Sequence, residues 1–144
     1  MKPRLDQIDL VCADMDKTLA FYRLLGIAKP LVWRTKTGAH HSHVQLPGGL
    51  SLQFNSPALA RVYDKGYRGK SGGGGSVVIG FSVKTRRAVD QTYAKLVKAG
   101  HRGMTPPWDA FWGARYAIVA DPDGTHVGIM SPSTDKDRRP PPDV

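Results

Sequence analysis

The sequence predicts an α+β fold made of two copies of one unit, in which a strand and a helix are followed by three strands. First, I-D-L-V-C (8–12) precedes the first expected helix as I-G-F-S-V (79–83) precedes the second. Second, P-G-G (47–49) and D-P-D-G (121–124) mark equivalent hairpin turns. Self-similarity of this kind indicates an internal duplication. Third, the two helices share residues at matching positions, which are Asp16 and Asp90, Thr18 and Thr92, Ala20 and Ala94, and Gly26 and Gly100.

The first module is expected over residues 5–65. Residues 5–12 alternate between apolar and polar as a strand does. Asp14 suits the N-cap of the helix that follows, and Gly26 suits its C-terminal end. Three further elements are expected in order: a strand at Leu31–Thr35, a hairpin of His41–Leu46 and Leu50–Asn55, and a short helix at Pro57–Tyr63.

The second module is expected over residues 77–132. The glycine-rich segment 66–76 before it predicts a flexible connector, because ordering many glycines costs much entropy. Three prolines and mixed charges in 133–144 predict a disordered tail, which leaves one domain over 1–132. The expected elements are a strand at Val77–Val83, a helix at Arg86–Ala99 with Val89, Tyr93, Leu96 and Val97 inward, and a hairpin of Arg115–Ala120 and Thr125–Met130.

Composition narrows the range of partners. The net charge is +9, but the basic residues are scattered and form no patch interleaved with aromatics, so no nucleic-acid partner is expected. Such a surface favours a neutral or anionic small molecule. The chain has no apolar run long enough to span a membrane and no apparent signal peptide. The single cysteine, Cys12, agrees with a reducing compartment, so a cytoplasmic protein is expected.

Two segments carry a resemblance to a known family, A-D-M-D-K-T-L-A-F-Y-R-L-L-G-I (13–27) and W-G-A-R-Y-A-I-V-A-D-P-D-G (112–124). They resemble the vicinal oxygen chelate superfamily, which includes glyoxalase I, extradiol dioxygenases, fosfomycin-resistance enzymes and bleomycin-type antibiotic-binding proteins. The resemblance extends over residues 5–132. It implies two βαβββ modules that form a half-open curved sheet around a cavity. It also implies a homodimer, because members of this superfamily usually build or complete their sites across a dimer.

The same resemblance implies where metal ligands would stand, on the first and last strands of each module. The four corresponding positions hold Gln7, Gln53, Val78 and Gly128. Valine and glycine offer no ligand atom, and a neutral amide is a weak ligand beside histidine or a carboxylate. We therefore expect no bound metal ion and no other cofactor.

Strand alternation adds Asp9, His126 and Met130 to the face that would line the cavity. Tryptophans at its lip would give the usual composition of a small-molecule site, although such residues also serve as core or dimer-interface residues. Arg115 is either a clamp for an anionic group or a partner of Asp109. The predicted ligand-binding residues are Gln7, Trp33, Gln53, Trp108, Trp112, Arg115, Gly128 and Met130.

These residues predict a metal-independent binding protein that sequesters an aromatic or planar drug or metabolite, rather than an enzyme. The alternative is a lyase, isomerase or dioxygenase-like enzyme of the same superfamily. It would use an off-pattern metal, or Asp9 holding His126 as an acid or base. Against that pair stands the simpler interpretation that each residue only satisfies neighbouring polar groups.

Three other motifs are weaker. D-M-D-K-T (14–18) imitates the nucleophile loop of a phosphatase, but the chain is short for that fold and Asp14 suits a helix cap. G-K-S (69–71) lacks the first glycine of a phosphate-binding loop. His40, His41 and His43 are metal ligands by count only, and we expect surface strand residues there.

Overall fold

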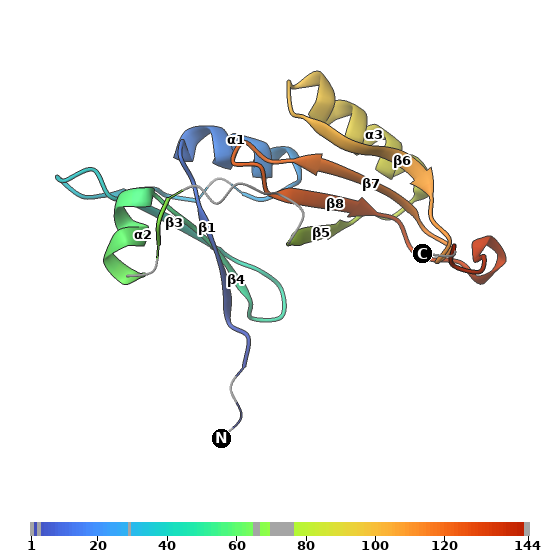
Figure 1. Ribbon diagram of the computed structural model, residues 1–144, viewed down its shortest axis with the longest axis horizontal. Coiled ribbons are helices and arrows are strands. Elements are labelled where there is room, and N and C mark those ends of the chain that lie inside the picture. The colour runs from blue at the N-terminus through green and yellow to red at the C-terminus, as the bar shows by residue number, and fades with distance from the viewer. Residues whose placement is uncertain (1, 3, 29, 65–66, 70–76, 143–144) are drawn as a thin grey trace. The chain divides into compact units, whose positions relative to one another are not determined.

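The computed structural model describes residues 2, 4–28, 30–64, 67–69 and 77–142, and the chain divides into two compact units, Met1–Gly72 and Gly73–Val144. Within the described residues each unit contains one four-stranded sheet (Figure 1). The strand order is β1-β4-β3-β2 in the first unit and β5-β8-β7-β6 in the second. In both sheets the first strand of the unit pairs in parallel with the last. The predicted α+β class and the duplication are confirmed.

The first unit follows the predicted order of elements. The Asp14 side chain accepts a hydrogen bond from the Lys17 backbone N–H at 3.1 Å, which caps α1. Gly26 follows the end of α1 with φ of +90°, a conformation that favours glycine. The predicted strand around Trp33 is shorter than expected. The elements are β1 (Gln7–Val11), α1 (Met15–Leu24), β2 (Trp33–Arg34), β3 (His40–Gln45), β4 (Ser51–Asn55) and α2 (Pro57–Tyr63).

One face of the first sheet is apolar and carries the core of this unit. Leu52 and Phe54 on β4 are almost fully buried. Phe21 and Tyr22 of α1 are also fully buried, and the Tyr22 ring centroid lies 5.4 Å from that of Phe54. Burying such side chains contributes roughly 1.5–3 kcal/mol each, so this face anchors α1 and leaves the opposite face for polar residues.

In the second unit, α3 lies against β6, β7 and β8 (Figure 1), and Val89 and Leu96 of this helix are fully buried. Val97, which was predicted to point inward, is 42% exposed, because it follows Leu96 by one residue and points about 100° away around the helix. The elements are β5 (Val78–Ser82), α3 (Arg86–Lys98), β6 (Gly103–Asp109), β7 (Arg115–Ala120), β8 (His126–Met130) and the 3₁₀ turn η1 (Asp135–Asp137).

Strand β6 had no residue-level prediction, because Pro106 and Pro107 interrupt any strand pattern. The structure explains how they are tolerated. β6 is an edge strand, and its register against β7 shifts on both sides of Thr105. Prolines fit there because an edge strand and a bulge leave N–H groups outside the ladder.

In the tail, for which disorder was predicted, the described residues 133–142 form backbone contacts with the loop between β6 and β7. The Thr134 N–H donates to the Gly113 carbonyl, and the Arg139 N–H donates to the Phe111 carbonyl. Trp112 and Arg138 also form an isolated antiparallel bridge. Backbone donors of the described tail residues thus find partners in this loop.

Two further expectations concern connections. The predicted flexible connector, 66–76, lies outside the described residues except for 67–69. Among the described helices, none has the length and apolar character needed to cross a bilayer.

Candidate functional site

The face of the first sheet opposite Phe54 is called here the polar face. Residues paired across neighbouring strands share a face, so register assigns its members. It is composed of three rows, which are Gln7, Ser51 and Gln45, then Asp9, Gln53 and His43, and then Val11, Asn55, His41 and Trp33.

A chain of hydrogen bonds crosses the polar face. The two oxygens of Asp9 accept from separate amides, Oδ2 from Gln7 Nε2 at 2.7 Å and Oδ1 from Asn55 Nδ2 at 2.8 Å. Asn55 Oδ1 lies 2.7 Å from His41 Nδ1. His41 Nε2 in turn lies 3.3 Å from His43 Nδ1. Asn55 is buried and connects the carboxylate to the imidazoles.

Tyr63, near the end of α2, joins this chain. Asn55 Nδ2 lies 3.3 Å from the Tyr63 hydroxyl. Burial raises the pKa of Tyr63, the hydrogen bond with Asn55 lowers it, and the nearby negative charge of Asp9 raises it. The net shift is upward, so the hydroxyl stays protonated at neutral pH and keeps a proton that it can donate.

The structure places three predicted ligand-binding residues, Gln7, Gln53 and Trp33, on the polar face. Gln53 donates to Ser51 Oγ at 2.8 Å. Trp33 stands on the edge strand β2 and is 57% exposed. They share this face because the rows to which they belong are two residues apart along the strands, and every second residue of a strand points to the same side.

The corresponding face of the second sheet is called the aromatic face. Trp108, Tyr116 and Met130 lie in one row across β6, β7 and β8. The Trp112 ring lies edge-on to Trp108 at 5.6 Å between centroids and to Tyr116 at 5.4 Å, and its Nε1 is 3.4 Å from Met130 Sδ. Phe111 also contacts Trp112, at 5.1 Å between ring centroids. The predicted aromatic lip is thus present as a contiguous group.

Two glycines lie beside this group as cross-strand partners, Gly80 on β5 and Gly128 on β8. No described atom lies within 4 Å of a Cβ built on Gly80, so the backbone there is bare. A Cβ on Gly128 would lie 2.5 Å from the Tyr116 hydroxyl. Open space therefore exists at Gly80, but at Gly128 it is filled, because the Tyr116 ring leans over the glycine.

The four positions at which the resemblance implies metal ligands do not suit a metal ion. Gln7 and Gln53 offer only amides, and the Gln7 amide nitrogen is hydrogen-bonded to Asp9. Val78 has no ligand atom, and at Gly128 the Tyr116 ring occupies the space that a ligating side chain would need. Among the described residues, no three histidine, cysteine or acidic side chains gather as a possible metal site.

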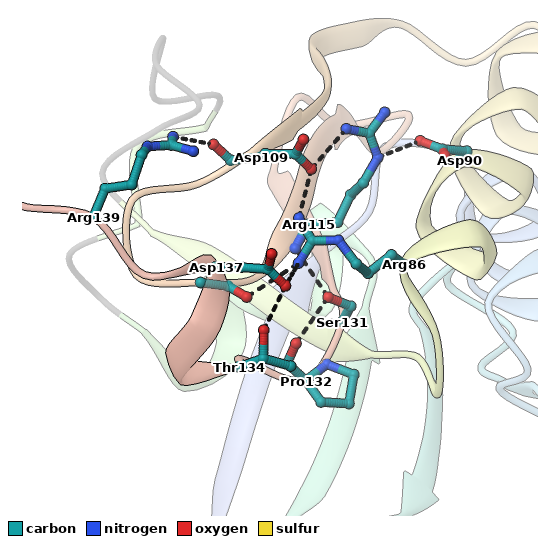
Figure 2. Close-up of polar contacts among 10 residues, drawn as sticks. Arg86, Asp90, Asp109, Arg115, Ser131, Pro132, Thr134, Asp137 and Arg139 are labelled. Atoms are coloured by element: carbon teal, nitrogen blue, oxygen red, sulfur yellow. Dashed lines mark hydrogen bonds and ion pairs between the residues drawn. The ribbon is translucent and has the colours of Figure 1, made fainter.

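Arg115 belongs to an ion-pair network on the opposite side of the second sheet (Figure 2). Its Nε donates to Asp90 Oδ1 of α3 at 2.8 Å, and its Nη1 donates to Asp109 Oδ1 at 3.0 Å. Tyr116 is the next residue of β7 and lies on the aromatic face, so the Arg115 side chain points away from that face. Of the two interpretations, pairing with Asp109 is the one that the structure bears out, and the predicted role in ligand binding is not supported.

Two arginines together bind Asp109. Arg86 Nη2 donates to Asp109 Oδ1 at 2.6 Å, and Arg86 Nη1 lies 3.5 Å from Asp137 of the C-terminal segment. The hydrogen bonds that Arg86 and Arg115 donate lower the pKa of Asp109, while the hydrogen bonds that Arg115 donates to Asp90 and Asp109 raise the pKa of Arg115. The network connects α3, β6, β7 and η1 within the second unit.

The predicted catalytic pair is divided between the two units. Asp9 lies on β1 of the first unit, with both oxygens bound by Gln7 and Asn55. His126 lies on β8 of the second unit, in register with Val78. Their pairing and the cavity between the modules stay predictions.

Sequence reasoning treated His41 and His43 as surface strand residues, and it assigned no site role to three further members of these faces, namely Asn55, Tyr63 and Tyr116. A signal for His41, His43 and Asn55 was present. If the residues of the hairpin are counted outward from the P-G-G turn, His43 falls opposite Gln53 and His41 opposite Asn55, as observed. The positions of Tyr63 and Tyr116 depend on a helix–sheet contact and on a side-chain rotamer, which strand alternation does not encode.

Comparison with known proteins identifies the family to which these two βαβββ units belong. The family described as the Glyoxalase/Bleomycin resistance protein/Dioxygenase superfamily matches residues 4–129, and the chain belongs to this superfamily. No protein with a curated description matches the sequence.

Solved structures agree with this fold. A glyoxalase-related enzyme from Fulvimarina pelagi is 23% identical over 90% of this chain and 88% of its own, with a TM-score of 0.70. A glyoxalase/bleomycin resistance protein/dioxygenase family enzyme from Burkholderia phytofirmans PsJN is 17% identical over 90% of this chain and 98% of its own, with a TM-score of 0.70. A protein from Agrobacterium tumefaciens is 22% identical over 92% of this chain and 100% of its own, also with a TM-score of 0.70. At these identities the likeness concerns the fold.

Proposed function

We propose that this chain binds an aromatic or planar small molecule on its aromatic face, without a metal ion, and sequesters it unchanged. The observation that carries the proposal is the group of Trp108, Trp112 and Tyr116 beside the bare backbone of Gly80. A flat ring system can approach an uncovered glycine backbone closely and meet the Tyr116 ring at its edge. The net charge of +9 favours a neutral or anionic ligand, such as a drug or metabolite of that kind.

The energetic scale follows from the aromatic contacts. Each well-placed aromatic pair contributes roughly 0.5–1.5 kcal/mol beyond the area it buries. Since about 1.4 kcal/mol corresponds to a tenfold change in affinity, losing one such contact weakens binding by roughly two- to tenfold. Blocking the bare patch at Gly80 removes the space itself and has a larger effect.

The experiment titrates a panel of aromatic antibiotics and metabolites while tryptophan emission is recorded, and then recovers each compound by chromatography. Gly80→Leu fills the patch, where a new Cβ meets no described atom within 4 Å. Val97→Leu adds bulk at an exposed position of α3 and is the control. A ligand that binds the parent and Val97→Leu but not Gly80→Leu supports the proposal.

Two outcomes overturn it. Equal affinity in Gly80→Leu and the parent means that the aromatic face is not the site. A compound that is recovered chemically changed makes the protein an enzyme. That alternative used Asp9 and His126, and it needs Asp9 to exchange one of its two amide partners for an imidazole. The engaged state of Asp9 therefore favours binding over catalysis.

The proposal includes a homodimer in a reducing compartment such as the cytoplasm, where the buried side chain of Cys12, the single cysteine of the chain, stays a thiol. Each sheet has two outer strands, which are β1 and β2 in the first unit and β5 and β6 in the second. The edge of an outer strand can pair with another chain. Light scattering at micromolar concentration is expected to return twice the 15.7 kDa chain mass. A mass of 15.7 kDa that persists on concentration contradicts the dimer.

A further inference from the structure

The polar face contains two imidazoles whose ring nitrogens are close together. His41 Nε2 and His43 Nδ1 are 3.3 Å apart on alternate residues of β3. Neither is one of the four positions at which the superfamily resemblance implies metal ligands, although His43 is the cross-strand neighbour of one of them, Gln53. The question is what these two nitrogens can bind.

The hydrogen-bond chain fixes which nitrogen of His41 is free to accept. Asn55 Nδ2 donates to the Asp9 carboxylate, so Asn55 Oδ1 is the atom that faces His41. An amide oxygen only accepts, so His41 Nδ1 carries the proton. His41 Nε2 therefore presents a lone pair toward His43. Metal-binding histidines are commonly oriented in this way, with the other ring nitrogen donating to an oxygen of a neighbouring group.

The distance between the two nitrogens suits a shared metal ion. In a tetrahedral zinc site the metal–nitrogen bonds are about 2.0–2.1 Å, so two such ligands lie about 3.3 Å apart. His43 is exposed, so its ring can turn its Nδ1 lone pair toward an ion without moving packed atoms. The Nδ1 proton is then carried on Nε2 of the same ring, and no net proton is released.

The charge around the pair also favours a cation. The strand residues of the polar face include one formally charged side chain, Asp9, which is negative. His40 and Arg34 pair with each other on the opposite face of the sheet. The positive charge of the chain as a whole is thus not concentrated at this pair.

We propose that His41 Nε2 and His43 Nδ1 together bind one transition-metal ion, Cu²⁺ most tightly and Zn²⁺ more weakly, with Asn55 and Asp9 as positioning residues. The order follows the general preference of nitrogen ligands among divalent metals. Two protein ligands leave the remaining coordination positions to water or to an added donor. The site lies within the first unit, and it does not depend on the proposed function.

The experiment uses the full chain and the metal salts alone. Isothermal titration with Cu²⁺ and Zn²⁺ is expected to give one ion per chain, and electron paramagnetic resonance of the Cu²⁺ complex is expected to show two nitrogen ligands. His41→Gln and His43→Gln should each weaken binding at least tenfold. His40→Gln on the opposite face and His126→Gln in the second unit are matched controls and should bind as the parent does.

Asp9→Asn tests the positioning role. Removing a direct hydrogen-bond partner of a metal-binding histidine typically costs 10–100-fold in metal affinity. Asp9 acts one step further out, through Asn55, so we expect a smaller loss, of at most about tenfold. The Cu²⁺ spectrum of this variant should still show two nitrogens, because the ligands themselves remain. No stoichiometric binding by the parent, or binding that survives both His41→Gln and His43→Gln, overturns the site. Unchanged affinity in Asp9→Asn overturns the role of the hydrogen-bond chain.

Discussion

The polar face and the aromatic face are the same surface of the same repeated unit, and they carry opposite chemistry. The row of Val11, Asn55, His41 and Trp33 in the first unit corresponds by register to Ser82, Met130, Tyr116 and Trp108 in the second. Both rows end on an exposed tryptophan of an edge strand. Between the ends, the first row interacts through nitrogen and oxygen atoms, whereas the second interacts through rings and sulfur.

The comparison separates what the backbone provides from what the side chains add. Strand pairing fixes which residues stand next to each other, and it is identical in the two units along these rows. The kind of molecule that either face can hold depends on the residues in the rows. Four predictions test this separation, beginning with the largest expected effect.

The first prediction concerns the contact of the C-terminal segment with the loop between β6 and β7, in which the Thr134 N–H donates to the Gly113 carbonyl. The described part of the first unit has no equivalent contact. Gly113→Ala is expected to destabilise the second unit by roughly 2–5 kcal/mol. Gly113 has φ of +92°, and an added Cβ would lie 2.4 Å from the Thr134 carbonyl oxygen. Gly124→Ala is the control, because its φ of +85° is strained in the same sense but no described atom lies within 4 Å. It should cost only about 1–2 kcal/mol in urea unfolding. Equal losses in the two variants would show that the tail does not close on Gly113.

The second prediction compares equivalent positions of the two rows. Asn55→Ala is expected to cost about 1–3 kcal/mol, because it removes a buried amide together with its hydrogen bonds to Asp9 and His41. Met130→Ala should cost less than about 1 kcal/mol, since Met130 is 37% exposed and loses mainly its contact with Trp112. Thermal unfolding of both variants measures the difference. A larger loss in Met130→Ala would contradict the polar network as a source of stability.

The third prediction uses the two paired glycines of the aromatic face. Gly128→Ala is expected to cost about 1 kcal/mol and to displace the Tyr116 ring, because the new methyl group would meet its hydroxyl. Gly80→Ala should be neutral or stabilising by up to about 1 kcal/mol, since an alanine orders a strand more easily than glycine does. Near-ultraviolet circular dichroism should change in Gly128→Ala alone, as Tyr116 moves relative to Trp112. A spectrum that changes in both variants would mean that the patch at Gly80 is covered.

The fourth prediction is the smallest and concerns pH. Hydrogen bonds from Arg86 and Arg115 hold the pKa of Asp109 below its usual value of 3.8. The resulting stability is present above pH 3.8 and is lost as pH falls through the lower pKa of the folded state. Asp109 is about half exposed, so the contribution is within the roughly 0.2–1 kcal/mol of surface pairs. Asp109→Asn should therefore reduce the difference between the urea midpoints measured at pH 5 and at pH 3. An unchanged difference would contradict a stabilising role of the two arginine contacts.

Much of the fold could be predicted because it depends on local signals. Alternation located β1 and β5, and the P-G-G and D-P-D-G turns located both hairpins. The Asp14 cap and the Gly26 end of α1 followed from residue type. The edge strand β6 was not predicted, because two prolines hide a strand that tolerates them only at an edge with a bulge.

The candidate sites were predicted less completely. Alternation and turn counting assign Gln7, Gln53 and Trp33 to one face, and they could also have found His41 and His43. The lean of Tyr116 over Gly128 and the hydrogen bonds of Arg115 depend on side-chain rotamers and on the approach of α3. Such contacts form only in three dimensions, so residue spacing does not reveal them.

The parallel pairing of the first and last strand in each unit also affects how the protein is made. Gln7 pairs with Ser51, a separation of 44 residues, and Val78 pairs with His126, a separation of 48. Closing loops of this length must precede the contacts that stabilise them, so each sheet is expected to complete slowly. Because each sheet draws its strands from its own half of the chain, the first can assemble during synthesis before the second has left the ribosome. The order of synthesis then favours pairing of each strand within its own unit.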